Sequence, residues 1–344
     1  MIMGQEVMHI DLANITEEEL LNVKVCNLPV KIEGTWVWDC IAELYKELLI
    51  KELKFKPQCY LADEWLTPDG EPIVGVPFFI AHPTLMKLER KMMFDVEGGT
   101  KQSCLKLLRH ETGHAINYAY KLYKRRKWQK IFGKFSTEYK DFYRFRPYSK
   151  NFVIHLDDYY AQYHPDEDFA ETFSVWLTLG LDWHNQYKGW GALRKLKYVD
   201  ELMNEIKVKE PVVPNGNKYW QAKNLRVTLK NYYKKRKHSS AEDFPDFHDL
   251  NLKKMFVCED KKTKLPLAAE VIKRYNKDIV NNVYSWTREK KHIINDLLKT
   301  IIARCKELKL ITSDSETIVV LKTSTYITTL IMNYRYTGKF RGKK

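Results

Sequence analysis

The chain has 344 residues, of which 44% are hydrophobic, so it can bury a large core in one or two domains. Its formal net charge of +14 at pH 7 indicates a basic surface. No apolar stretch of about 18 residues occurs, and residues 1–6 lack the basic start and apolar run of a signal peptide, which argues against membrane and secreted classes. The six cysteines are scattered without a CxxC pair. We therefore expect reduced thiols, no membrane partner and a cytoplasmic location.

The N-terminal part of the chain predicts helices followed by a strand. Thr16 and Glu19 have the spacing of a capping box, and apolar residues recur at helical offsets over residues 36–53. Residues 73–83 are the best strand candidate in this part, and Pro77 would confine that strand to a sheet edge or a bulge.

Residues 100–120 predict a single helix, with Thr100 at its N-cap after two glycines. Inside it lies the sequence His110-Glu111-Thr112-Gly113-His114. Histidines at i and i+4 share a helical face, so both imidazoles can reach one Zn²⁺, and Glu111 would project towards a water on that metal. Glycine costs about 1 kcal/mol relative to alanine within a helix, so Gly113 indicates a close backbone neighbour.

A search with so short a motif brings many false positives, so the prediction needs a third ligand. The pattern HExxHxxGxxH is excluded, because Asn117 and Tyr120 stand at its glycine and third histidine. The other source is a carboxylate on a later helix, which residues 164–177 predict, with a proline at the first helical position and acids in the first turn. Spacing alone leaves Glu167 and Glu171 open, with His164 as a rival ligand.

The two segments resemble a bacterial family of zinc-binding metallopeptidases. The resemblance rests on Leu-Leu-Arg-His-Glu-Thr-Gly-His-Ala (107–115) and His-Pro-Asp-Glu-Asp-Phe-Ala-Glu-Thr-Phe-Ser-Val-Trp-Leu (164–177), with support from 187–200 and 241–247, and it covers roughly residues 55–250. The second segment is more distantly similar to the ligand helix of anthrax lethal factor and of secreted Pro-Pro endopeptidases. Those enzymes are gluzincins, with a zinc-ligand glutamate, a second acid four residues later and a tyrosine seven residues before the ligand.

The resemblance implies a role for each candidate residue. The implied zinc ligands are His110, His114 and Glu167, the implied general base is Glu111, and the implied acceptor of a histidine N–H is Glu171. Tyr160 falls at the position of the tyrosine, where a phenol can donate to the oxyanion that develops on a substrate. The plainer interpretation of Tyr160 is a half-buried packing residue.

Two neighbouring features have simpler interpretations. Asp168 lies about 100° of helical rotation from Glu167 and is expected to be a surface or capping acid. In zincins an edge strand commonly pairs with extended substrate, and residues 73–83 are placed to do so by analogy. An ordinary edge strand explains the same residues.

Residues 121–150 carry eleven cations against two carboxylates, and further basic runs lie at residues 218–237 and in the C-terminal tail. Aromatic residues such as Trp128, Phe135 and Tyr139 are interleaved with the cations, as in many nucleic-acid-binding proteins. The plainer interpretation is a solvated helical face with its aromatics in the core, because no nucleic-acid fold signature accompanies the charge. We expect only weak, non-specific nucleic-acid binding through this surface.

Residues 238–249 change in composition from basic to acidic, so we place a domain boundary there. Residues 1–237 are expected to form a zincin-like zinc metallopeptidase domain, and residues 238–344 a mainly helical domain of unknown role. Within the latter, residues 266–283 and 285–308 predict helices and residues 317–321 a strand, whereas residues 324–337 fit either. The expected fold class is α+β: a mostly helical zincin-like metallopeptidase core with a small mixed sheet, plus a mainly helical C-terminal region.

Two classes of function follow. The first is a gluzincin-type zinc metallopeptidase that hydrolyses peptide or protein substrates. The alternative is a basic nucleic-acid- or partner-binding protein with a structural zinc core, or a protease acting on DNA-bound proteins. The salt dependence of DNA binding separates the classes, because phosphate contacts weaken steeply as salt rises.

Overall fold

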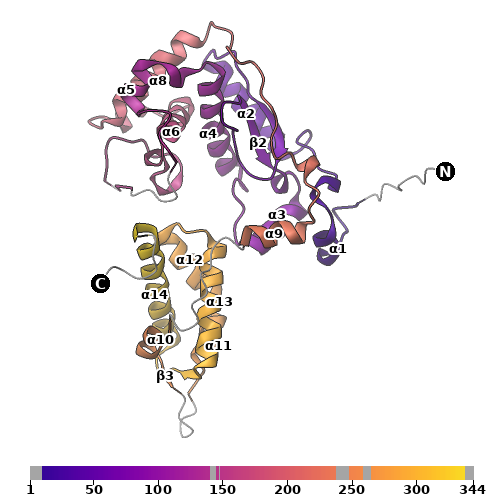
Figure 1. The fold of residues 1–344 in the computed structure, drawn as a ribbon, viewed down its shortest axis with the longest axis vertical. Coiled ribbons are helices and arrows are strands. Elements are labelled where there is room, and N and C mark those ends of the chain that lie inside the picture. Colours follow the sequence, from indigo (N-terminus) through magenta and orange to yellow (C-terminus); the bar gives the residue numbers. More distant parts are fainter. Residues whose placement is uncertain (1–9, 140–144, 147, 238–247, 259–264, 338–344) are drawn as a thin grey trace, which may run out of the picture. The chain divides into compact units, whose positions relative to one another are not determined.

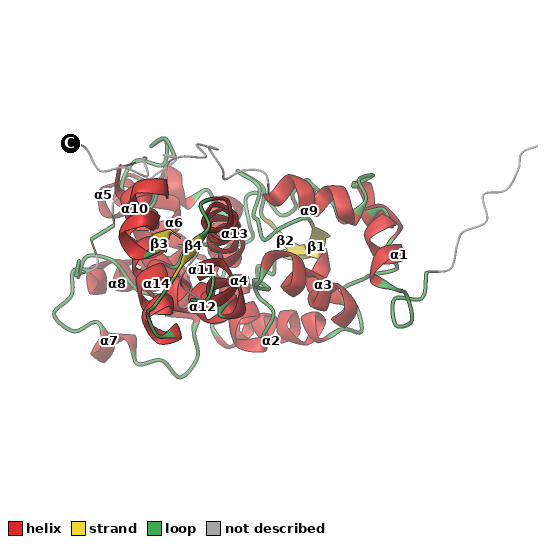
Figure 2. Ribbon diagram, turned by 90° about the horizontal axis from the view of Figure 1, so that it is seen from below, coloured by secondary structure: helices red, strands yellow, loops and turns green. Residues whose placement is uncertain are grey.

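The computed structural model describes residues 10–139, 145–146, 148–237, 248–258 and 265–337. The chain divides into two compact units, Met1–Lys91 with Val96–Tyr232 and Met92–Asp95 with Tyr233–Lys344. The predicted boundary after residue 237 coincides with the end of helix α9 (Leu229–Lys237), close to this division. In the described residues each unit is mostly helical and contains one two-stranded sheet, so the mostly helical α+β class is confirmed (Figures 1 and 2).

The first unit begins with α1 (Glu17–Asn22), where the predicted capping box is confirmed. Glu19 N–H donates to Thr16 Oγ1, and Thr16 N–H donates to Glu19 Oε2 at 3.0 Å. The 3₁₀ turn η1 (Val25–Asn27) precedes α2 (Trp36–Ile50), which corresponds to the helix predicted over residues 36–53. The buried side chains of α2 recur every three to four residues, which gives it one apolar face: Val37, Cys40, Ile41, Leu44 and Leu48.

Strands β1 (Gln58–Ala62) and β2 (Ile73–Pro77) form a parallel pair. Only the first five residues of the predicted strand 73–83 are strand, because Phe78–Ala81 form the 3₁₀ turn η2. All five residues of β2 are buried, and Gly75 N–H donates to the Leu66 carbonyl at 2.7 Å. Leu66 therefore covers, at Gly75, the edge of β2 that β1 leaves free. The expectation that β2 offers an open edge to substrate is wrong at this position.

The central helix of the first unit is α4 (Lys101–Ala119). This helix contacts α2, β2 and α6 (Pro165–Leu177), as the upper part of Figure 1 shows. The other elements are α3 (Pro83–Met93), η3 (Leu122–Lys124), α5 (Arg126–Phe132), η4 (Asp157–Gln162), α7 (Trp183–Gln186), α8 (Ala192–Ile206) and η5 (Ala222–Asn224).

The second unit is mainly helical, as predicted. Its elements are α10 (Asp249–Met255), β3 (Val257–Cys258), α11 (Ala268–Arg274), α12 (Asn276–Thr287), α13 (Lys291–Glu307), β4 (Leu310–Ile311) and α14 (Glu316–Thr337). The helix predicted over residues 266–283 is divided at Tyr275 into α11 and α12, and the helix predicted over residues 285–308 starts only at Lys291.

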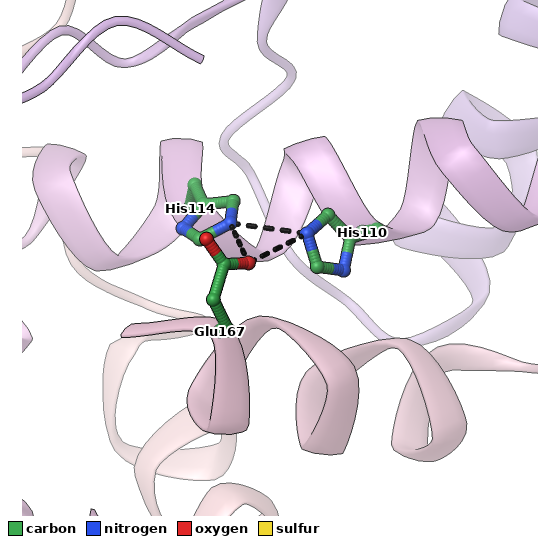
Figure 3. Close-up of side chains that lie close together, drawn as sticks. All are labelled: His110, His114 and Glu167. Atoms are coloured by element: carbon green, nitrogen blue, oxygen red, sulfur yellow. Dashed lines mark hydrogen bonds and ion pairs between the residues drawn. The ribbon is translucent and has the colours of Figure 1, made fainter. Parts of the chain in front are cut away.

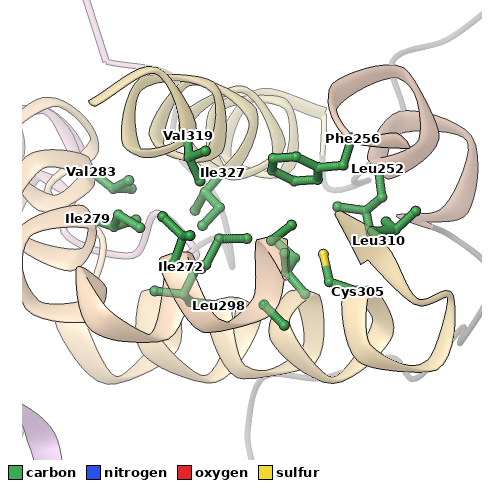
Figure 4. Close-up of a cluster of buried hydrophobic side chains, with 14 of the residues drawn as sticks. Leu252, Phe256, Ile272, Ile279, Val283, Leu298, Cys305, Leu310, Val319 and Ile327 are labelled. Atoms are coloured by element: carbon green, nitrogen blue, oxygen red, sulfur yellow. The ribbon is translucent and has the colours of Figure 1, made fainter. Parts of the chain in front are cut away.

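The strand predicted over residues 317–321 is wrong, because these residues form the first turns of α14. Val319, Ile327 and Ile331 recur at helical spacing and pack into the apolar core of the second unit. Figure 4 shows Val319 and Ile327 of α14 facing Ile272, Ile279 and Leu298 of the other helices. Burial in this core outweighs the modest β preference of valine and isoleucine.

None of the helices in the described ranges is both long and apolar enough to cross a membrane.

Candidate metal centre

Helix α4 carries the two histidines in a buried stretch. The predicted N-cap is confirmed, because Thr100 Oγ1 accepts a hydrogen bond from Ser103 N–H at 3.1 Å. From His110 to Ala119 every residue is buried, including the polar ones. This part of α4 is therefore surrounded by protein on all sides, and each of its polar groups needs a partner.

Helix α6 begins at Pro165, as predicted, and His164 caps it. The His164 Nδ1 accepts from Asp166 N–H at 3.1 Å, and its Nε2–H donates to the Thr137 carbonyl at 2.7 Å. Both ring nitrogens are thus engaged in holding the start of α6. His164, the rival ligand, lies outside the group formed by His110, His114 and Glu167.

The two helices cross in opposite directions, since His110 lies against Glu171 and Asn117 against Asp166. At the crossing, a Cβ on Gly113 would lie 2.7 Å from Ala170 Cα and 3.0 Å from the Ala170 carbonyl oxygen. The close backbone neighbour predicted for Gly113 is therefore confirmed, and it is α6. Glycine at this position allows the carboxylates of α6 to reach the imidazoles.

Three buried side chains converge at this crossing: His110, His114 and Glu167 (Figure 3). The Glu167 Oε2 lies 3.1 Å from His110 Nε2 and 3.2 Å from His114 Nε2, and the two Nε2 atoms are 3.2 Å apart. Glu167 rises from α6 towards the two rings in Figure 3. Two imidazole nitrogens and one carboxylate oxygen thus form a nearly equilateral triangle that could hold a metal ion.

Each histidine uses its other nitrogen to bind a carboxylate. His110 Nδ1 lies 2.8 Å from Glu171 Oε1, and the second oxygen of Glu171 accepts from Leu156 N–H at 2.8 Å. Glu171 therefore has the predicted position beside a histidine. His114 Nδ1 lies 2.8 Å from Asp166 Oδ2. Carboxylates in these positions fix the orientation of each ring and leave both Nε2 atoms directed at the same point.

The partnership of Asp166 with His114 was missed by the sequence reasoning. Asp166 is 1% exposed, and its carboxylate also accepts from Asn117 Nδ2 and Tyr118 Oη, each at 2.6 Å. The available signal was the polar pair Asn117-Tyr118, one turn after His114, between the apolar residues Ile116 and Ala119. These hydrogen bonds hold the Asp166 side chain in place.

The charges of this cluster are strongly coupled. Burial lowers the pKa of His110, but its hydrogen bonds to Glu167 and Glu171 raise that pKa to about 9. Burial also lowers the pKa of His114, and Asp166 and Glu167 more than reverse this effect. Burial raises the pKa of Glu167, but the two histidines hold it well below the usual carboxyl range. These carboxylates therefore favour the protonated form of both imidazoles, so a metal ion competes with protons for them.

The remaining predicted site residues lie beside this group. Glu111 is buried and is not one of the three convergent side chains. Burial raises the pKa of its carboxyl group. Its backbone carbonyl accepts from Thr67 Oγ1 at 3.0 Å. The ring of Tyr160, on η4, has its centroid 5.6 Å from that of His110. Both residues thus belong to the same site as the three convergent side chains.

A second tyrosine was missed at the sequence level. The Tyr139 hydroxyl donates to Glu167 Oε1 at 3.2 Å, and the Tyr139 ring stacks on His164 with centroids 3.8 Å apart. The phenol thus occupies the oxygen of Glu167 that does not face the histidines. In the sequence Tyr139 is one of several aromatics among basic residues, and it lies 28 residues before Glu167 in a segment without helical periodicity.

The expectation for Asp168 as a surface or capping acid is wrong. Asp168 is 2% exposed, and Lys195 Nζ, itself buried, donates to its Oδ2 at 2.5 Å. Burial raises the pKa of Asp168 to about 7, although Lys195 acts in the opposite direction. Asp168 therefore ties α6 to α8 on a different side of the helix from Glu167.

The charged segment 121–150 is only partly described, since Lys140, Asp141 and Arg144 lie outside the described residues. Trp128 and Phe132 are buried, in agreement with the interpretation that aromatics of this segment belong to the core. Part of the basic tail also lies outside the described residues, including Lys339 and Arg341.

No protein-family model, curated protein or solved structure matches the chain. The geometry of the site is therefore the basis for any functional conclusion.

Proposed function

We propose that this chain is a zinc-dependent metallopeptidase of the gluzincin type, with a zincin-like core, that hydrolyses peptide bonds in peptide or protein substrates. The observation that carries the proposal is the buried triangle of His110 Nε2, His114 Nε2 and Glu167 Oε2. The six cysteines are all unpaired, which supports the expected cytoplasmic location.

The donor set supports zinc over other common ions. Two donors bound to a tetrahedral ion at about 2.0–2.1 Å stand about 3.3 Å apart, close to the 3.1–3.2 Å edges of the triangle. Calcium and magnesium favour sets of six or more oxygen ligands, which this site does not offer. Two histidines and one glutamate, with a fourth position left for water or substrate, are a ligand set of catalytic zinc sites.

The carboxylates behind the histidines strengthen the case for a built site. Glu171 and Asp166 each hold one imidazole in the tautomer whose free nitrogen faces the centre. Burying a cluster of acids and histidines costs solvation free energy, so such a cluster is expected where a function requires it. Apolar side chains at these positions would lower the free energy of folding more, if the helix crossing were only structural.

A bound Zn²⁺ would supply Lewis acidity to a water molecule and to a peptide carbonyl. Glu111 then accepts a proton from the attacking water and returns it to the leaving amine. Burial raises the pKa of Glu111, which makes its carboxylate a stronger base. Tyr160 donates a hydrogen bond to the oxyanion, and Tyr139 keeps the second oxygen of Glu167 occupied.

Metal analysis of purified protein tests the ligand assignment. We expect about one Zn²⁺ per chain, and loss of most of it in His110→Ala and in Glu167→Ala. His164→Ala is the control, because His164 caps α6 and should cost stability without removing zinc. Retention of zinc in Glu167→Ala, with its loss in His164→Ala, would move the third ligand to His164.

A further inference from the structure

One side of the metal centre is built from residues 121–139, which we name the basic wall. This segment contains η3, α5 and the loop that follows, with seven lysines and arginines against one carboxylate, Glu138. Its last residue touches the site directly, because Tyr139 Oη donates to Glu167 Oε1. The Thr137 carbonyl accepts from His164 at the start of α6. The basic wall is therefore continuous with the metal centre.

The end of the basic wall lies between the site and solvent. Tyr139 is 47% exposed, yet its hydroxyl reaches the buried Glu167. A side chain that is in solvent along part of its length and touches a ligand residue at its tip lies where the buried site meets solvent. A polypeptide that reaches the three ligands at this place passes next to residues 134–139.

Most of the positive charge of the basic wall is available to a ligand. Arg125 and Lys127 are paired with Glu205 and Glu201 of α8. Within the described part of the chain the other five cations form no ion pair: Lys121, Lys124, Arg126, Lys130 and Lys134. The exposed carboxylates of Glu138 and Asp69 offset part of this charge. Asp69 lies near the basic wall, since burial and, to a smaller extent, the charge of Asp69 raise the pKa of Tyr123.

Two of these lysines flank a ring stack that leads to the site. The Tyr123 and Phe135 rings stack with centroids 4.2 Å apart, and Lys124 and Lys134 are their sequence neighbours. The Phe135 ring lies 6.2 Å from that of Tyr118, whose hydroxyl donates to Asp166 beside His114. Lys124 and Lys134 are both exposed, and this ring stack holds their backbone near His114.

The aromatic residues of the basic wall favour a polypeptide ligand over a nucleic acid. Binding to single-stranded nucleic acid relies on exposed rings on which bases stack. Here Trp128 and Phe132 are buried, Tyr123 and Phe135 stack on each other, and Tyr139 stacks on His164. These rings already pack against other side chains of the protein, so the exposed cations are the groups left to attract a ligand.

We propose that the preferred substrates are acidic polypeptide segments, whose aspartate and glutamate side chains on one side of the scissile bond bind the lysines of the basic wall. This inference rests on the proposed peptidase function and specifies its substrate class. The attraction is a long-range charge interaction, so it raises the rate of productive encounter and weakens with salt.

Cleavage of matched peptides tests the preference. Three fluorogenic peptides share one cleavable centre and carry flanking glutamates, serines or lysines. With zinc-loaded wild-type protein at low salt, we expect kcat/KM to be about 10-fold higher for the glutamate peptide than for the serine peptide, and lowest for the lysine peptide. The double variant Lys124→Glu, Lys134→Glu should remove this order, so that kcat/KM for the glutamate peptide no longer exceeds that for the serine peptide. Lys46→Glu with Lys87→Glu, exposed lysines of α2 and α3, is the matched control and should preserve it.

Binding separates failure of this inference from failure of the peptidase proposal. Zinc-loaded Glu111→Gln protein is titrated into fluorescein-labelled forms of the same peptides and into a single-stranded oligonucleotide of equal charge. Tighter binding of the glutamate peptide, lost in the double variant, supports the inference even if no peptide is cleaved. Equal affinity for the glutamate and serine peptides overturns it. An oligonucleotide that displaces the glutamate peptide at physiological salt overturns it as well and identifies nucleic acid as the ligand.

Discussion

Helices α4 and α6 bury charge, whereas the second unit buries hydrocarbon. Of the seven buried carboxylates in the described residues, five lie on α4 and α6: Glu111, Asp166, Glu167, Asp168 and Glu171. The described part of the second unit buries no carboxylate, and its core consists of side chains such as Ile272, Leu298 and Ile327. Burial of such side chains stabilises a fold directly, at roughly 1.5–3 kcal/mol each.

The difference supports the proposal that the crossing of α4 and α6 is the functional region. Buried charges cost solvation free energy, which hydrogen bonds and opposite charges only partly return. A helix crossing with a purely structural role would be expected to bury apolar side chains, as the core of the second unit does. Regions that break the rules of packing in this way are commonly functional sites, and the crossing of α4 and α6 has the ligand triangle at its centre.

The largest effect is expected from Glu111→Gln, which should lower peptide hydrolysis by about 10³-fold or more with normal folding and zinc content. The variant keeps the side-chain shape and removes the proton acceptor. Initial rates on a cleavable peptide, with zinc measured on the same sample, test this. Glu138→Gln, an exposed carboxylate of the basic wall, is the control and should leave the rate on an uncharged peptide almost unchanged. Wild-type protein that holds zinc and cleaves no member of a broad peptide library would contradict the peptidase proposal.

In the second unit, Leu298→Ala should lower the free energy of unfolding by about 2–5 kcal/mol without affecting zinc. Leu298 is fully buried, so truncation loses apolar burial and leaves a cavity. Hydrogen exchange followed by mass spectrometry should show lost protection in α11–α14 and unchanged protection in α4 and α6. The control is Leu321→Ala, since Leu321 on the same unit is 57% exposed. Equal loss of protection in α4 would mean that the two regions unfold as one.

Tyr160→Phe should lower kcat by about 10²-fold, which is less than the effect at Glu111. One hydrogen-bond donor to the oxyanion is lost while the rest of the site is kept. Steady-state kinetics measure the change, and zinc content should stay constant. Tyr163→Phe is the matched comparison, because its ring lies 5.8 Å from that of Tyr160. A larger loss in Tyr163→Phe would move the role to Tyr163.

Asp166→Asn should weaken zinc binding about 10- to 100-fold, the smallest of the four effects. Asparagine keeps the size of the side chain but removes the charge that orients His114. Competition with a chelator measures the zinc affinity. Asp200→Asn provides the control, because Asp200 accepts from Trp176 Nε1 at the far end of α6. Unchanged zinc affinity in Asp166→Asn would show that Asp166 has only a structural role.

The sequence by itself determined the local features of the site. The cap at Thr100, the helix start at Pro165 and the close contact at Gly113 were predicted, because each depends on a few neighbouring residues or on one residue type. Helical spacing placed His110 and His114 on one face of α4. The carboxylate of Glu167 was selected among its neighbours by resemblance, since periodicity does not distinguish it from Glu171.

Only the tertiary structure decided which partners meet. Asp166 and His114 are 52 residues apart, and Tyr139 and Glu167 are 28 apart, so no local pattern links them. Asp168 is buried because Lys195 of α8 lies against it, and residues 317–321 are helical because Val319 packs into the core of the second unit. Leu66 covers β2 at Gly75 through backbone hydrogen bonds that do not depend on side-chain identity. Sequence periodicity specifies helices and their faces, whereas the crossing of α4 and α6 specifies which charges become neighbours, because that crossing depends on packing across the whole unit.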